Sequence, residues 1–515
     1  MDYTHNMNKE DTKKEEKALQ DIQSRLEREN HLIAERIKKL AELKEKYVLP
    51  YRFEKKHSNK ELQEKYSSLK PEEHTDDIAV TAGRIIGLRR MGKVTFMHLM
   101  DNDAKIQLYF NDGEYANYSD LKLLDMGDFI GVKGNLFKTK TGELTIKVIE
   151  MEFLSKAIRP LPEKYHGLQD TEIKYRQRYL DLIMDDTSKK RFVTRTKIIK
   201  TVREFLDERG FLEVENPIIQ PIYGGAAAKP FVTYYNDLNM KAYLRISLEL
   251  YLKKLIVGGF EKVYEMGKVF RNESIDTSHN PEFTLMELYW AYADYNDIMV
   301  LVEDLYNYVA LKVLGTTKIT YQGKEIDLKR PWKRMTMTDA LLEYGGIDVK
   351  KLSEQEIKAL LDKHKIEYRD NMNRGLLINQ LFKIVEEKLI QPIFITDHPK
   401  ETTPLCRLHR ENPELIERFE PYINGWEIGN AYSELNDAIR QRYLLEEQAK
   451  ELRAGIGDAN PMDEDFCKAI DYGFPPTGGL GLGIDRMVML LTDSVSIRDV
   501  IFFPTMKPQE ETLKK

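Results

Sequence analysis

Residues 268–295 read KVFRNESIDTSHNPEFTLMELYWAYADY, and this stretch decides the fold of the chain. Both of its ends alternate apolar and polar side chains with a period of two, which is typical of β-strands. The first strand ends at FRNE, where Arg271 and Glu273 are two positions apart and therefore project from one face. A polar loop containing His279 and Asn280 follows. The sequence thus predicts two strands joined by a long polar loop.

The second strand, EFTLMELYW, places a carboxylate on an otherwise apolar face. Phe283, Leu285, Glu287 and Tyr289 share that face, and the intervening side chains point the other way. A buried carboxylate needs a partner, because burying it alone is costly. Taken alone, Glu287 fits a structural or surface role better than a functional one.

The composition excludes several classes of protein. Of 515 residues, 79 are Lys or Arg and 85 are Asp or Glu, giving a formal charge of −6, so a nucleic-acid partner must be bound by local patches. Two cysteines, Cys406 and Cys467, exclude a disulfide scaffold and a Cys-rich zinc site. No apolar run approaches the about 18–20 residues of a membrane span, and the first residues are too polar for a signal peptide. We expect a cytoplasmic, multidomain enzyme with no membrane partner.

The chain upstream of this stretch divides by its periodicity. Residues 9–47 contain an apolar stripe at helical spacing, which predicts one long helix in an N-terminal helical extension at 1–76. Residues 77–157 read as five short strands with Gly, Asp and Asn turns, a pattern typical of a small closed barrel and most often of the OB-fold. Within it, residues 87–94 nearly spell a phosphate-binding P-loop. They end in Val94 and run into a strand, so we reject that interpretation.

The remainder is an α+β region. A proline-bounded linker is expected at 158–174, followed by a catalytic domain at 175–515. An amphipathic helix is expected at 196–211, ended by Gly210, and a helical insertion at 335–390.

The hairpin resembles motif 2 of the class II aminoacyl-tRNA synthetases. Residues 196–217, TKIIKTVREFLDERGFLEVENP, resemble motif 1, and residues 478–490, GGLGLGIDRMVML, resemble motif 3. Within that class the chain is similar to the lysyl-tRNA synthetases (subclass IIb) of bacterial and eukaryotic cytosolic type. GGAAAKPF (224–231), MELYWAYADY (286–295) and EIGNAYSELND (427–437) follow their pattern.

The resemblance implies a catalytic domain built on an antiparallel sheet flanked by helices, and a homodimer formed through motif 1. It implies a lysine–tRNA ligase, which makes lysyl-adenylate from L-lysine and ATP with Mg²⁺ and transfers lysine to the 3′ end of tRNA(Lys). Aspartyl and asparaginyl enzymes share this architecture, but a buried Glu287 would repel an acidic substrate. An inactive RNA-binding paralogue is a second alternative. It predicts losses at Arg271, Glu427, Glu434 or Arg486, and none is lost.

The resemblance also assigns the site residues. Arg271 and Arg486 are the expected catalytic residues, because a guanidinium binds phosphate and carboxylate oxygens bidentately. The expected ATP contacts are Arg271, Glu273, His279, Asn280, Phe283 and Arg486. The expected lysine contacts are Gly225, Glu249, Glu287, Tyr289 and Asn436.

Glu427 and Glu434 are the expected magnesium ligands, since a hard cation prefers carboxylate oxygens. An offset of seven would place them on opposite faces of a regular strand, so we expect an irregularity near Gly429 or Asn430. On the barrel, Phe96, Gln107 and Glu143 are expected to read the anticodon, Phe96 by stacking and the others by hydrogen bonds. Each of these three alone also fits an ordinary barrel side chain.

Overall fold

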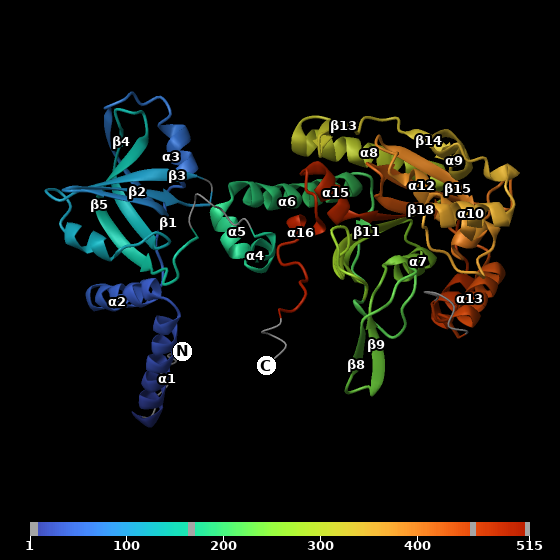
Figure 1. Ribbon diagram of the computed structural model, residues 1–515, viewed down its shortest axis with the longest axis horizontal. Coiled ribbons are helices and arrows are strands. Elements are labelled where there is room, and N and C mark those ends of the chain that lie inside the picture. The colour runs from blue at the N-terminus through green and yellow to red at the C-terminus, as the bar shows by residue number, and fades with distance from the viewer. Residues whose placement is uncertain (1–8, 103, 163–169, 454–459, 510–515) are drawn as a thin grey trace. The chain divides into compact units, whose positions relative to one another are not determined.

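The structure is a computed structural model that describes residues 9–102, 104–162, 170–453 and 460–509. It divides into two compact units, Met1–Gly167 and Leu168–Lys515 (Figure 1). Residues 1–8 of the expected N-terminal extension, 163–169 of the expected linker and 510–515 of the expected catalytic domain lie outside the described ranges. Within those ranges, every helix is too short or too polar to span a lipid bilayer.

The first unit is a barrel with helices at its N-terminal end. Its elements are α1 (Lys9–Glu29), α2 (His31–Lys46), α3 (Asn59–Lys65), β1 (His74–Met91), β2 (Val94–Met100), β3 (Lys105–Asn111), the 3-10 helix η1 (Tyr118–Leu123), β4 (Phe129–Lys138) and β5 (Leu144–Ser155).

The five described strands close in the order β1-β2-β3-β5-β4, which confirms the predicted OB-fold barrel. Alternate residues such as Leu99, Leu108 and Phe153 point inward and are fully buried, as the period of two requires. Gly92, at φ 60°, forms the turn between β1 and β2. The P-loop-like stretch is therefore the tip of a hairpin, and its rejection is correct.

The prediction of a single helix over 9–47 is wrong. The helix breaks at Asn30, whose backbone is extended and whose side chain accepts a hydrogen bond from the Leu32 N–H, so that α2 starts as a new capped helix. The apolar stripe is buried only on α2, where Leu43 joins the barrel core; Leu19 and Ile22 on α1 are exposed.

The second unit carries the remaining elements. These are α4 (Thr171–Arg176), α5 (Arg178–Met184), α6 (Asp186–Asp207), β6 (Leu212–Glu213), β7 (Ile219–Gln220), β8 (Val232–Tyr235), β9 (Met240–Leu244), α7 (Glu249–Val257), β10 (Lys262–Phe270), β11 (Glu282–Ala291), α8 (Tyr295–Leu314), β12 (Lys318–Tyr321), β13 (Lys324–Asp327), β14 (Lys333–Thr336), α9 (Met337–Gly345), η2 (Val349–Lys351), α10 (Glu354–Lys363), α11 (Arg374–Leu381), α12 (Lys383–Glu386), β15 (Ile393–Pro399), η3 (Lys400–Thr402), β16 (Leu415–Ile423), β17 (Trp426–Glu427), β18 (Gly429–Ser433), α13 (Ala438–Arg453), α14 (Glu464–Asp471), β19 (Thr477–Gly483), α15 (Ile484–Leu491) and α16 (Ile497–Val500).

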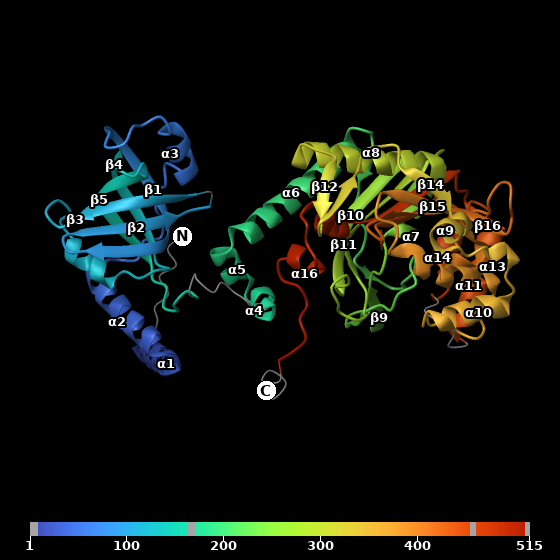
Figure 2. The ribbon, with the colours of Figure 1, turned by 45° about the horizontal axis from the view of Figure 1, so that its top comes forward.

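A sheet of nine described strands organises this unit. Its order is β14-β15-β16-β18-β19-β11-β10-β6, with β17 paired to β16, and its pairs are antiparallel except β14/β15 and β10/β6. Helices α6, α8 and α15 share one apolar core with Met286 and Leu288 of β11. Figure 2 shows α8 lying along the sheet that contains β10 and β11. The predicted antiparallel sheet flanked by helices is thus confirmed.

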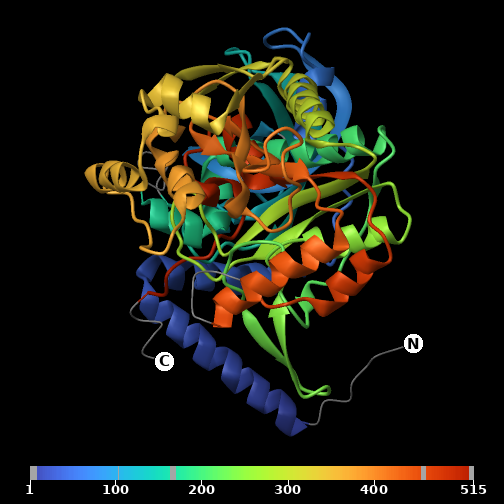
Figure 3. The ribbon, with the colours of Figure 1, turned by 90° about the vertical axis from the view of Figure 1, so that its right-hand side faces the viewer.

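Two helical segments differ in detail from the sequence prediction. Helix α6 begins ten residues before the predicted start of 196, because the Asp185 side chain caps it by accepting a hydrogen bond from the Thr187 N–H. It ends at Asp207, and Gly210, at φ 77°, lies in the following turn. Between the parallel neighbours β14 and β15, helices α9 to α12 form a separate buried cluster. The β8–β9 hairpin projects from this unit (Figures 1 and 3).

Candidate active site

One cavity of about 410 Å³ lies against the central strands β11, β18 and β19. It brings together most of the side chains predicted from the sequence. The predicted residues that line it are Gly225, Glu249, Arg271, Glu273, His279, Asn280, Phe283, Glu287, Tyr289, Glu427, Glu434 and Arg486. Asn436 is not among the described residues that line the cavity; it follows β18, just before α13.

Strand β11 lies between β10 and β19, and the face that carries Glu287 and Tyr289 lines this cavity. Met286 and Leu288 enter the core, and Glu287 and Tyr289 face the cavity, as the alternation predicts. The adjacent strand β19 contributes glycines there, with Gly479 next to Tyr289 in the register of the two strands. A Cβ on Gly479 would lie 1.9 Å from a carboxylate oxygen of Glu434 and 2.7 Å from the Tyr289 ring. Only glycine leaves this space open.

Glu287 is buried and held by donors from the neighbouring loop. Its Oε1 accepts hydrogen bonds from the Ser247 hydroxyl at 2.9 Å and the Leu248 N–H at 3.0 Å. Burial, together with the nearby charge of Glu249, raises the pKa of Glu287 to about 7 despite these donors. A cation bound beside Glu287 would favour its ionised form, so this end of the cavity suits an ammonium group.

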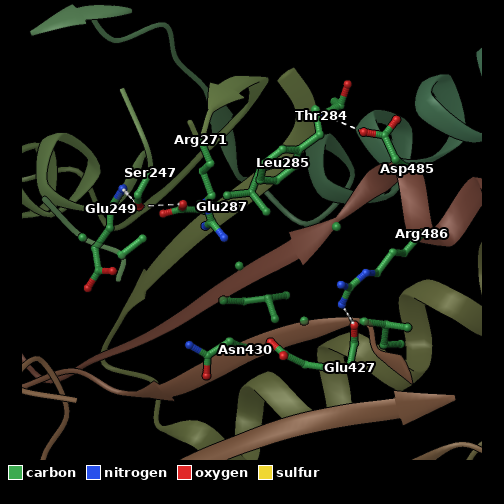
Figure 4. Close-up of a pocket in the computed structure, with 18 of the residues that line it drawn as sticks. Ser247, Glu249, Arg271, Thr284, Leu285, Glu287, Glu427, Asn430, Asp485 and Arg486 are labelled. Carbon is green, nitrogen blue, oxygen red and sulfur yellow. Dashed lines mark hydrogen bonds between the residues drawn. The ribbon is translucent and has the colours of Figure 1, made fainter. Parts of the chain in front are cut away.

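Two arginines provide positive charge in the same cavity. Arg271 follows β10; its guanidinium lies 5.2 Å from the Phe283 ring centroid, and its Nε donates to the Ile246 carbonyl at 3.4 Å. Arg486, in the first turn of α15, donates to the backbone carbonyl of Glu427. Figure 4 shows Arg271 beside Glu287 and Arg486 beside Glu427. The cavity thus has separate groups suited to ammonium and to oxyanions.

The loop between β10 and β11 is ordered by its own side chains. His279 Nδ1 lies 2.8 Å from Asp276 Oδ2. The Asn280 amide donates to the Glu282 carbonyl at 2.6 Å and accepts from the Thr505 N–H at 3.1 Å. The side chain of Asn280 therefore fixes the loop, while that of His279 stays exposed at the rim.

The two predicted metal ligands have different surroundings. The strand is interrupted at Ile428, between β17 and β18, close to the irregularity that the offset of seven predicts. Glu434 Oε2 lies 2.5 Å from the ammonium of Lys253. Burial and the charge of Glu420 raise the pKa of Glu427 to about 7, and among the described residues its carboxylate has no hydrogen-bond partner. The described part of the chain holds no group of three or more His, Cys, Asp or Glu side chains arranged for a metal ion.

The sequence analysis missed Asp485, a residue of α15 whose side chain bonds to β11 and to α6. Its Oδ1 lies 2.5 Å from Arg195 Nη1, and its Oδ2 accepts from the Thr284 N–H at 2.7 Å. This carboxylate sits in the first turn of α15, where the helix dipole favours a negative charge. In the sequence, its position directly before Arg486 was the signal that could have identified it as a site residue.

The sequence analysis also missed Lys253, whose ammonium lies 2.5 Å from Glu249 Oε1. The spacing of four between Glu249 and Lys253 on a helix is a signal for such a pair.

On the barrel, the three predicted anticodon residues lie on one outer face. Gln107 Nε2 donates to Glu143 Oε2 at 2.8 Å, and His98 Nε2 lies 3.0 Å from Glu143 Oε1. Phe96 lies opposite Tyr109 across β2 and β3, with ring centroids 5.4 Å apart. The face therefore combines partly exposed rings with hydrogen-bonding groups, which suits single-stranded bases.

Each of the two units matches a known protein family. Residues 170–507 match the family of class II tRNA synthetases (D, K and N), and residues 79–154 match the OB-fold nucleic acid binding domain. The chain belongs to the class II tRNA synthetases of the D, K and N group, which confirms the family resemblance seen in the sequence.

Its relatives include proteins named lysine–tRNA ligase. The protein from Clostridium novyi (strain NT) is 50% identical over 506 residues, covering 96% of this chain and 98% of the relative. The protein from Moorella thermoacetica (strain ATCC 39073 / JCM 9320) is 49% identical over 493 residues, covering 95% and 100%. The protein from Thermoanaerobacter sp. (strain X514) is 50% identical over 489 residues, covering 94% and 97%.

Proposed function

We propose that this chain is a lysine–tRNA ligase, which activates L-lysine with ATP to lysyl-adenylate and transfers lysine to the 3′ end of tRNA(Lys). The observation that carries the proposal is the buried carboxylate of Glu287 in the same cavity as Arg271 and Arg486. An ammonium-binding carboxylate next to two oxyanion-binding guanidiniums fits a cationic amino acid that reacts with a triphosphate.

The chemistry requires the lysine carboxylate to approach the α-phosphate of ATP in line. Two anions repel each other, so positive charge near the reacting atoms matters more than a general base. Arg271 holds the α-phosphate and the lysine carboxylate, Arg486 holds the γ-phosphate, and Phe283 stacks on adenine. Glu273, His279 and Asn280 complete the nucleotide contacts from the loop.

The amino-acid end accommodates two ammonium groups. Glu287 and Tyr289 receive the ε-ammonium, while Gly225, Glu249 and Asn436 receive the α-ammonium. Gly225, at φ 82°, has no room for a side chain, because a Cβ would lie 2.9 Å from the Ser247 hydroxyl. This lets the backbone come close to the substrate.

Magnesium is the proposed cofactor; when bound, it would supply positive charge that offsets the charge of the ATP phosphates. Of the two predicted ligands, Glu427 fits the ion, because its half-buried carboxylate lies near the charge of Glu420 and forms no ion pair among the described residues. Glu434 is engaged with Lys253 instead. Glu427→Gln should raise the magnesium concentration needed for ATP–pyrophosphate exchange, whereas Glu434→Gln should mainly raise the lysine KM. Equal magnesium dependence of both variants would contradict this division.

The barrel is proposed to bind the anticodon of tRNA(Lys) through Phe96, Gln107 and Glu143. Because charging of tRNA supplies the ribosome, we place the protein in the cytoplasm.

We also propose a homodimer through motif 1. Among the described strands, β6 lies at the edge of the large sheet, and Leu212, Ile218 and Ile219 nearby are exposed. A second copy of the chain would cover this apolar edge. Ile219→Arg should therefore lower the mass in sedimentation equilibrium, and Ile439→Arg, at an exposed position of α13, serves as the control. A monomeric wild-type protein would refute the dimer.

ATP–pyrophosphate exchange with lysine, aspartate and asparagine separates this function from its alternatives. Lysine alone should drive exchange. Exchange driven by aspartate or asparagine would identify the related specificities, and tRNA binding without any exchange would identify an inactive paralogue.

A further inference from the structure

Lys253 is a cation buried at the amino-acid end of the active site. It lies on α7, it is 2% exposed, and its ammonium is 2.5 Å from Glu249 Oε1 and 2.5 Å from Glu434 Oε2. The same ammonium lies 5.8 Å from the Tyr289 ring centroid and 5.5 Å from that of Tyr432. Lys253 thus links Glu249, at the start of α7, to Glu434, directly after β18, and both carboxylates line the cavity.

The groups around Lys253 show why this end of the site needs a built-in cation. Glu249, Glu287 and Glu434 are each at most 5% exposed and line one cavity. Three buried carboxylates that share a small volume repel each other, and burying each one without a partner is costly. Burial opposes the charge on Lys253, but Glu249 and Glu434 outweigh burial and raise its pKa. Lys253 therefore stays positively charged.

The charges at this end can be counted. Three carboxylates and one ammonium give two net negative charges when all are ionised. The proposed substrate brings two ammonium groups to this end, and its carboxylate faces Arg271. The net negative charge of the site therefore matches the two positive charges of the substrate's ammonium groups.

We infer that Lys253 is a positioning and specificity-determining residue of the amino-acid site. Its ammonium holds Glu249 and Glu434 in place and sets the net charge at the value that a diammonium amino acid neutralises. This inference rests on the proposed function and assigns to Lys253 a role that does not require contact with the substrate.

The test begins with the lysine and ATP KM values of the full-length wild-type protein in ATP–pyrophosphate exchange. Absence of lysine-dependent exchange at this stage would refute the proposed function rather than the role of Lys253. Lys253→Met keeps an unbranched side chain of similar length and removes the charge. It should raise the lysine KM at least tenfold and leave the ATP KM within twofold. The matched control is Lys254→Met, the next residue on α7, whose ammonium pairs with the exposed Asp465 at 2.6 Å and which should change neither KM.

A double variant separates charge from packing. Lys253→Met with Glu434→Gln restores two net negative charges, so its lysine KM should be lower than that of Lys253→Met and of Glu434→Gln alone. If Lys253→Met does not fold, the comparison of the double variant with Glu434→Gln decides the question. An unchanged lysine KM in Lys253→Met, equal increases in the lysine and ATP KM values, or a double variant worse than Glu434→Gln would overturn the inference.

Discussion

Replacing Glu287 by glutamine removes one charge from the centre of the proposed lysine site and changes little else. The amide oxygen of glutamine can still accept from the Ser247 hydroxyl and the Leu248 N–H, which both donate to Oε1. The amide NH₂ then occupies the place of Oε2, 3.4 Å from the Tyr289 hydroxyl. A donor would thus face the substrate ammonium where an acceptor stood before.

The expected size of the effect follows from the burial of this pair. Glu287 is 4% exposed, so solvent does not screen it. Removing one member of a buried, hydrogen-bonded charge pair costs about 2 to 5 kcal/mol. At about 1.4 kcal/mol per tenfold, the lysine KM should rise roughly 30-fold to a few thousand-fold.

ATP–pyrophosphate exchange measures this with lysine and ATP varied separately. The ATP KM should change less than threefold, because the phosphate-binding arginines remain. Glu282→Gln is the matched control, since Glu282 lies on the same strand and its side chain is exposed, 3.6 Å from Lys268. An unchanged lysine KM in a Glu287→Gln protein that unfolds at the wild-type temperature would refute the charge pairing.

Two further substitutions test other parts of the molecule, and a change of pH tests Glu287 itself. Arg486→Ala should raise the ATP KM about tenfold to a hundredfold, from the loss of hydrogen bonds to a charged phosphate, and a normal ATP titration would exclude that contact. Phe96→Ala should raise the tRNA KM in aminoacylation by about 5- to 150-fold, from a stacking energy of about 1 to 3 kcal/mol, without changing ATP–pyrophosphate exchange; a loss of both activities would point to misfolding instead. Because burial raises the pKa of Glu287 to about 7, the lysine KM should rise as pH falls from 8 to 6, while the Glu287→Gln variant should show a flat profile. The same raised pKa stabilises the empty protein most at low pH, and that contribution should be lost in thermal unfolding as pH rises through about 7.

The parts of the fold that follow from local periodicity could be predicted from the sequence. The alternation in residues 282–290 predicted that Glu287 and Tyr289 share one face of β11, and in the structure both line the cavity while Met286 and Leu288 lie in the core. The five barrel strands were predicted for the same reason. The break at Asn30 was missed because the apolar stripe continues on both sides of it, although the Asn30 side chain caps the start of a new helix there.

The parts of the site that depend on contacts between distant segments could not be predicted in this way. The pairing of Lys253 with Glu434 joins residues 181 positions apart, and the Asp485–Thr284 bond joins residues 201 apart. Glu427 and Glu434 are close in sequence, but the interruption at Ile428 and the partners of each carboxylate set their surroundings. A spacing along the chain does not contain this information.

The glycines of β19 determine in which direction the specificity of this site can be engineered. Gly479 and Gly481 have no side chain left to trim, so a larger amino acid cannot be admitted by mutating that wall. Every substitution at Gly479 fills the cavity, since even a methyl group would overlap Glu434. A protein engineer who wants to accept a bulkier lysine derivative must therefore shorten the aromatic side chains on either side of Gly479, Tyr289 on β11 or Tyr432 on β18.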